Sequence, residues 1–60
     1  MQLLKLRTDR KWSQEYVSRQ MKVSRQTVMN WESGESVPTA DKAVRLAKLF
    51  NTTVEKLMED

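Results

Sequence analysis

The sequence predicts an all-α protein, a compact bundle of five short helices. Apolar residues recur at the three- and four-residue spacing of a helix face in five successive segments. Residues that begin or end helices, namely Ser, Thr, Asn, Gly and Pro, stand between these segments. A chain of 60 residues has the size of one small domain, so we expect residues 1–60 to form a single domain.

Residues 2–10 are predicted to form the first helix. Leu3 and Leu6 lie three positions apart with Leu4 beside them, which gives this helix an apolar stripe. Arg7 follows directly and would lie at the edge of the stripe.

The second helix is expected to begin after Ser13, whose hydroxyl can accept a hydrogen bond from a backbone N–H of the first turn. Trp12 and Val17 flank this cap at the spacing of a hydrophobic staple. We expect Trp12 to be buried, with a half-exposed position as the alternative. Val17 and Met21 lie four positions apart and therefore share a face. The small Ser18 beside them would let another helix approach closely.

The third helix carries the same signals. Ser24 is its predicted N-cap, and Val23 with Val28 forms a second staple. Its end is predicted at Ser33, because Gly34 follows and glycine adopts the left-handed geometry of a helix end without strain.

Only Lys22 and Val23 separate Met21 from the cap residue Ser24. Two capped helices joined by so short a connector, with a small residue at their crossing, are typical of a helix-turn-helix. We therefore predict this motif over residues 14–34.

The third helix has two different faces. Val28 and Trp31 fall on one side, which we expect to be buried. The opposite side carries Arg25, Gln26, Met29, Asn30 and Ser33. Arginine pairs with guanine, asparagine and glutamine pair with adenine, and an apolar side chain can contact the thymine methyl group. The same face also fits a second interpretation, a solvated helix surface without a ligand.

Residues 35–38 are predicted to form a loop, since Pro38 cannot lie inside a helix. Thr39 is the predicted N-cap of a fourth helix that runs to about Phe50. Its inward face is predicted to consist of Ala40, Ala43, Val44, Leu46, Ala47 and Phe50.

A short fifth helix is expected at the end of the chain. Asn51 would end the fourth helix in a left-handed conformation. Thr53 would cap the fifth helix, whose apolar residues are Val54, Leu57 and Met58.

Several segments, in this order and at this spacing, resemble the Xre family of Cro and phage-repressor type helix-turn-helix proteins. They are Ser13–Glu15, Val23–Val28, Trp31–Gly34, Pro38–Thr39 and Leu46–Phe50. The resemblance extends from about Leu3 to Met58 and implies a lambda-repressor-like bundle.

The resemblance also implies a function: a sequence-specific regulator of transcription that binds double-stranded DNA. In the family the usual role is repression, by a homodimer bound to a two-fold operator with the third helix in the major groove. The dimer would be either preformed or induced by DNA. Expected base contacts are Arg25, Gln26, Met29 and Asn30. Expected DNA-backbone contacts are Gln14, Thr27, Ser33 and Ser36.

Gln14 would be the first residue of the second helix, where free backbone N–H groups favour a phosphate. The family resemblance further implies a structural bridge between Arg7 and Glu32. We expect this pair to be exposed and to orient the helices, because exposed ion pairs contribute only about 0–1 kcal/mol.

The sequence departs from the family pattern at two connections. Lys22 stands where the family commonly has glycine, because that turn requires a left-handed residue. Lys11 and Trp12 stand where the family usually has Gly and Leu.

The charge distribution favours a polyanionic partner. The chain has 11 basic and eight acidic residues, a net charge of +3. Seven basic residues and only two acidic ones lie between positions 5 and 25. The basic residues are Lys5, Arg7, Arg10, Lys11, Arg19, Lys22 and Arg25.

The absence of Cys and His argues against a thiolate metal site, a zinc-bound enzyme and a Ser-His enzyme. We expect no catalysis, no metal and no cofactor. The N-terminal residues contain no apolar run of signal-peptide or membrane length, so we expect a cytoplasmic protein without membrane contact.

Two alternatives stay open. Glu15, Glu32 and Glu35, close to the predicted DNA face, also suit a protein-interaction module or antitoxin-like partner that does not bind DNA independently. Among DNA binders, a phage-type repressor, an antitoxin and the first part of a larger regulator fit equally well. The chain stops just past the fifth helix, where a further domain would continue or a partner protein would bind.

Overall fold

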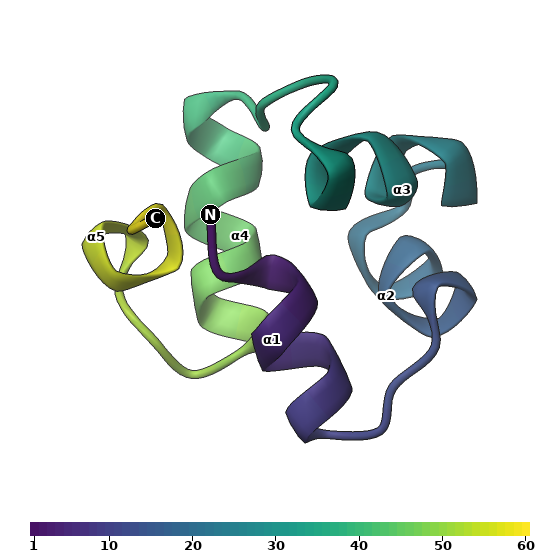
Figure 1. Cartoon of the computed structure of the whole chain (residues 1–60), viewed down its shortest axis with the longest axis horizontal. Coiled ribbons are helices and arrows are strands. Elements are labelled where there is room, and N and C mark those ends of the chain that lie inside the picture. Colours follow the sequence, from purple (N-terminus) through teal and green to yellow (C-terminus); the bar gives the residue numbers. More distant parts are fainter.

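Five α-helices make up the computed structural model, which describes residues 1–60 (Figure 1). They are α1 (Leu3–Asp9), α2 (Gln14–Met21), α3 (Arg25–Ser33), α4 (Ala40–Leu49) and α5 (Val54–Leu57). No strand is present, so the prediction of an all-α fold with five helices is confirmed. None of the helices has both the length and the apolar character needed to cross a membrane.

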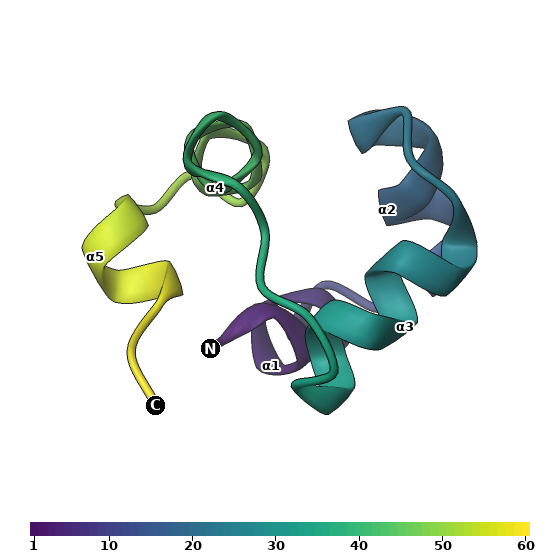
Figure 2. The same cartoon turned by 90° about the horizontal axis from the view of Figure 1, so that it is seen from above.

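The helices enclose one apolar core to which each of them contributes. Seen from above, α4 and α5 lie on one side and α2 and α3 on the other, with α1 between them (Figure 2). The buried cluster consists of Leu3, Val17, Met21, Val28, Trp31, Leu46, Ala47, Phe50 and Leu57. Trp31 is only 4% exposed, as predicted. Because Val28 and Trp31 are both buried, the core fixes which face of α3 turns outward.

Three of the four predicted N-caps form the expected hydrogen bond. The hydroxyl of Ser13 accepts from the backbone N–H of Tyr16, and that of Ser24 accepts from Thr27. Thr53 caps α5 in the same way. Each bond satisfies an N–H group that has no partner within its helix.

Thr39 precedes α4 as predicted, but its side chain makes no cap hydrogen bond, and this part of the prediction is wrong. Its hydroxyl instead donates to Oδ1 of Asp41 over 2.8 Å. This bond holds the pKa of Asp41 below its usual value.

Three helices end at a left-handed residue that is not glycine. Lys22 has φ 58° and Asn51 has φ 55°, and both conformations were predicted. Lys11 has φ 57°, which was not predicted, although the family pattern places glycine there. After each of these helices, two backbone N–H groups bond back to the carbonyls of its last turn, which is the Schellman arrangement.

Trp12 is half-buried, so the prediction of a buried tryptophan is wrong. Its ring lies between the buried Phe50, 5.3 Å away between centroids, and the exposed Tyr16, 4.9 Å away. The staple of α2 therefore sits at the margin of the core.

The predicted apolar faces of α1 and α4 are too wide. Leu4 is 48% and Val44 is 43% exposed, and Ala40 is also exposed. The buried residues of α4 and Phe50 span an arc of about 100°, and Ala40 and Val44 lie beyond its edge. Val54 on α5 is likewise exposed.

Candidate nucleic-acid interface

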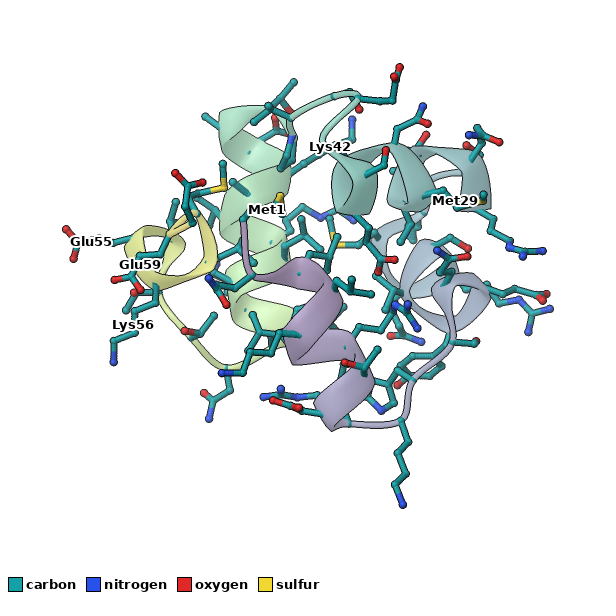
Figure 3. The ribbon with its side chains drawn as sticks, viewed as in Figure 1. Met1, Met29, Lys42, Glu55, Lys56 and Glu59 are labelled. Atoms are coloured by element: carbon teal, nitrogen blue, oxygen red, sulfur yellow. The ribbon has the colours of Figure 1, made fainter.

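Helices α2 and α3 pack on each other through the predicted turn and form the helix-turn-helix. The outer face of α3 carries exposed Arg25, Gln26, Met29 and Ser33 and half-buried Asn30. Met29 lies at one edge of the molecule, whereas Glu55 and Lys56 of α5 and the following Glu59 lie at the opposite edge (Figure 3). The four predicted base-contact residues thus share one accessible surface.

Two of these residues are joined. Nε2 of Gln26 donates to Oδ1 of Asn30 over 2.9 Å, one helical turn further along α3. Residues four apart face each other on a helix, which permits this contact.

Glu32 ties α3 to the two preceding helices. Its carboxylate accepts from Nε of Arg7 at 2.5 Å and from Nη2 of Arg7 at 3.2 Å. Nη1 of Arg7 also donates to the carbonyl oxygen of Trp12. The structure therefore contains the expected Arg7–Glu32 pair.

This pair is not exposed as expected, since the side chains of Arg7 and Glu32 are 14% and 6% exposed. Its energy is therefore not that of a surface pair: removing one partner would leave a largely desolvated charge without a counter-ion.

Gln14 takes part in the same network. Nε2 of Gln14 donates to Oε1 of Glu32 over 3.0 Å, a contact that the sequence did not predict. This bond leaves the second Nε2 hydrogen and the amide oxygen of Gln14 without a protein partner. The first residue of α2 is therefore held against α3 while its amide can still bond outward.

An open hollow of about 450 Å³ lies next to this network. The residues that line it are all polar or charged: Arg7, Ser13, Gln14, Glu15 and Arg25. The start of α2, with its free N–H groups and partial positive charge, and the start of α3 both border it. Two guanidinium groups and one carboxylate, that of Glu15, thus contribute to this lining.

The predicted backbone-contact residues other than Gln14 lie along α3 and just after it. The hydroxyl of Thr27 lies 2.8 Å from that of Ser24. The hydroxyl of Ser33 donates to the backbone oxygen of Asn30 over 3.2 Å. Ser36 is exposed, and its backbone N–H donates to the same oxygen of Asn30. The structure does not gather these residues in the hollow with Gln14.

Not all of the basic residues counted in the sequence face solvent. Arg7 is bound to Glu32, and Arg10 donates to the backbone carbonyl oxygens of Leu6 and Phe50. The remaining five, Lys5, Lys11, Arg19, Lys22 and Arg25, are exposed. The structural role of Arg10 was missed because its partner Phe50 lies forty residues away and no local pattern links the two.

The acidic residues near this surface are largely compensated. Glu15 forms an ion pair with Arg19, one helical turn away, and Glu32 has Arg7 and Gln14. Glu35 is exposed and makes no ion pair. The net field of these three carboxylates is therefore weaker than their number suggests.

Comparison with known proteins agrees with this geometry. The family model described as Helix-turn-helix matches residues 3–57, nearly the whole chain. The chain belongs to the Xre/Cro-type helix-turn-helix family. Proteins of this family bind DNA to regulate transcription and are typically not enzymes.

One relative is the HTH-type transcriptional activator BcrR of Enterococcus faecalis. It is 34% identical over 56 residues, which are 93% of this Xre-type chain and 28% of the relative. The chain thus spans less than a third of that relative's length. No solved structure matches the chain significantly.

Proposed function

We propose that α3 enters the major groove of double-stranded DNA and reads base edges there. The observation that carries this proposal is the outward face of α3, where Arg25, Gln26, Met29 and Asn30 are accessible while Val28 and Trp31 anchor the helix. The side-chain types suit guanine, adenine and the thymine methyl group. A helix of nine residues presents only a few side chains at a time to the base pairs.

The hollow beside α2 is proposed to hold a phosphate of the DNA backbone. Gln14 and the backbone N–H groups of the first turn of α2 would donate to the phosphate oxygens, and Arg25 would add positive charge. Thr27, Ser33 and Ser36 are proposed to contact the backbone further along the groove.

We propose that two copies of the chain bind a two-fold operator. One helix-turn-helix reads few base pairs, so a second copy is the usual way to gain specificity. Occupation of an operator that overlaps a promoter would repress transcription, which is the regulatory role that we propose.

Activation is the second candidate role, and the similarity to a protein named as an activator favours it. Because the chain spans 28% of that relative, the similarity covers only part of the protein that bears the name. A reporter gene with the bound sequence placed over or upstream of its promoter distinguishes the two roles.

An interaction module without DNA binding is the remaining alternative. The sequence supported it through three glutamates near the α3 face, Glu15, Glu32 and Glu35. In the structure, Glu15 and Glu32 each form an ion pair with an arginine. Because their charge is compensated, the balance favours a DNA-binding surface.

The deciding experiment is selection of bound duplexes from a random pool, followed by fluorescence anisotropy on the selected sequence. We expect a two-fold symmetric motif and an affinity that falls steeply with salt, because neutralised phosphates release counterions. If no duplex binds even at low salt, the interaction module is the correct interpretation.

A further inference from the structure

The amide of Gln26 is an exposed hydrogen-bonding group near the start of α3, and its orientation decides which base it can read. Adenine presents an acceptor, N7, and a donor, the N6 amino group, whereas guanine presents two acceptors, N7 and O6. A glutamine amide that rotates freely can match either base: one donor and one acceptor for adenine, or two donors for guanine.

In the structure this amide is not free. One hydrogen of Nε2 is bonded to Oδ1 of Asn30 at 2.9 Å, which fixes the side of the amide that faces along the helix. What remains for a base is one Nε2 hydrogen and the oxygen Oε1, neither of which has a protein partner. This set complements adenine and lacks the second donor that guanine requires.

Asn30 is suited to hold the Gln26 amide. It is half-buried, whereas Gln26 is exposed, so its shorter side chain has less conformational freedom to lose. Its backbone oxygen also accepts from Ser33 and Ser36, which ties this turn of α3 to the following loop.

We propose that Asn30 is a positioning residue: it holds the Gln26 amide in the orientation that selects adenine over guanine. This inference rests on the proposed function, because it assumes that α3 lies in the major groove. It assigns to Asn30 a role through Gln26, in addition to or in place of a base contact of its own.

The test begins with the site selected by the parent protein. The base pair read by Gln26 is the position at which Gln26→Ala loses its preference. Two duplexes that differ only there, with adenine or guanine, are then compared by fluorescence anisotropy. We expect the parent to favour adenine by about five- to hundredfold, the range of a good bidentate contact.

Asn30→Ala removes the acceptor and frees the amide. We expect the adenine preference to fall by about two- to tenfold, the effect of one net hydrogen bond, through stronger binding to the guanine duplex. Asn30→Asp is the matched control, since its carboxylate keeps an acceptor at the same place. The negative charge of Asn30→Asp should weaken binding to both duplexes alike and leave the ratio of their affinities unchanged.

NMR of the free protein gives a readout that does not depend on DNA. In the parent and in Asn30→Asp, the Nε2 hydrogens of Gln26 should differ in chemical shift and exchange rate from those of a free glutamine. In Asn30→Ala they should match those of a free glutamine. Circular dichroism melts establish that all three proteins are folded.

The outcomes separate this inference from the proposed function. If selection recovers no motif, the proposed function fails. If the motif is recovered but guanine is preferred at the Gln26 position, or Asn30→Ala keeps the parent ratio, only the inference is overturned. If both Asn30 variants lose preference at a different base pair while the adenine preference at the Gln26 position is unchanged, Asn30 reads a base directly without positioning Gln26, and the inference is again overturned.

Discussion

The guanidinium of Arg10 donates to the backbone carbonyl oxygen of Phe50 over 2.7 Å and so joins the end of α1 to the end of α4. Nη1 of the same group donates to the carbonyl oxygen of Leu6 at 3.1 Å. The cation also lies over the rings of Trp12 and Phe50, 5.7 Å and 5.3 Å from their centroids. A cation at two helix C-termini satisfies carbonyls that have no partner within their helices.

We expect Arg10→Ala to lower the free energy of unfolding by about 1.5–3 kcal/mol, the range for hydrogen bonds to a charged group. Arg10→Lys should recover only part of this loss, because an ammonium group lacks the planar fork that reaches two carbonyls. Urea denaturation measures the difference.

Lys5→Ala is the matched control, since Lys5 is an exposed basic residue of α1 whose side chain makes no ion pair. Its effect should stay within about 0.5 kcal/mol. Equal stability of the Arg10→Ala and Lys5→Ala proteins would show that Arg10 does not link the helices.

The left-handed conformation of Lys22 leads to a prediction about the turn. This geometry costs an L-residue about 1–2 kcal/mol, whereas glycine loses about 0.5–1 kcal/mol through its more flexible unfolded state. Lys22→Gly should therefore be neutral or stabilising by up to about 1 kcal/mol in a thermal melt.

Lys48→Gly provides the contrast, because Lys48 is exposed within α4 and has ordinary helical geometry. There glycine should cost about 1 kcal/mol. If the two glycine variants lose the same stability, Lys22 does not hold a left-handed conformation in solution.

Alanine substitutions of Gln14 and Gln26 should reduce the affinity for DNA in different ways. Gln26→Ala should cost about 1–3 kcal/mol on the selected site and relax preference at one base position, with non-specific affinity nearly intact. Gln14→Ala should weaken selected and scrambled duplexes about equally, because a phosphate contact carries no sequence information.

Anisotropy titrations of both duplexes at several salt concentrations measure this difference. If Gln26→Ala weakened binding to the selected and the scrambled duplex in equal proportion, α3 would not be the helix that reads the bases.

Asp41 gives a prediction that depends on pH. The hydroxyl of Thr39 is the largest cause that lowers the pKa of this carboxyl below its usual 3.8. Because the folded-state pKa is the lower one, its stabilising contribution is complete above the unfolded-state pKa and is lost as the pH falls through the folded-state pKa.

Thr39→Val removes the donor, and the pKa of Asp41 should then rise toward 3.8 in an NMR titration of the carboxyl carbon. Thr39→Ser keeps a hydroxyl and should keep the lowered pKa. An unchanged pKa in Thr39→Val would rule out this hydrogen bond as the main cause.

Local signals in the sequence were sufficient for the boundaries of the helices and for the face that α3 turns outward. Caps such as Ser13 and Ser24 and the turn at Lys22 act within about one helical turn, so the chemistry that sets them is adjacent in the chain. The family resemblance added one distant contact, the pair between Arg7 and Glu32.

The tertiary structure decided what depends on how the helices pack. The burial of the Arg7–Glu32 pair, the bond from Gln14 to Glu32 and the link from Arg10 to Phe50 join residues 18 to 40 positions apart. Helical spacing gives the direction of a side chain around its own axis, but not the distance or angle at which a second helix crosses it. For the same reason the exposure of Val44 and the half-burial of Trp12 emerged only once the five helices were placed around the core.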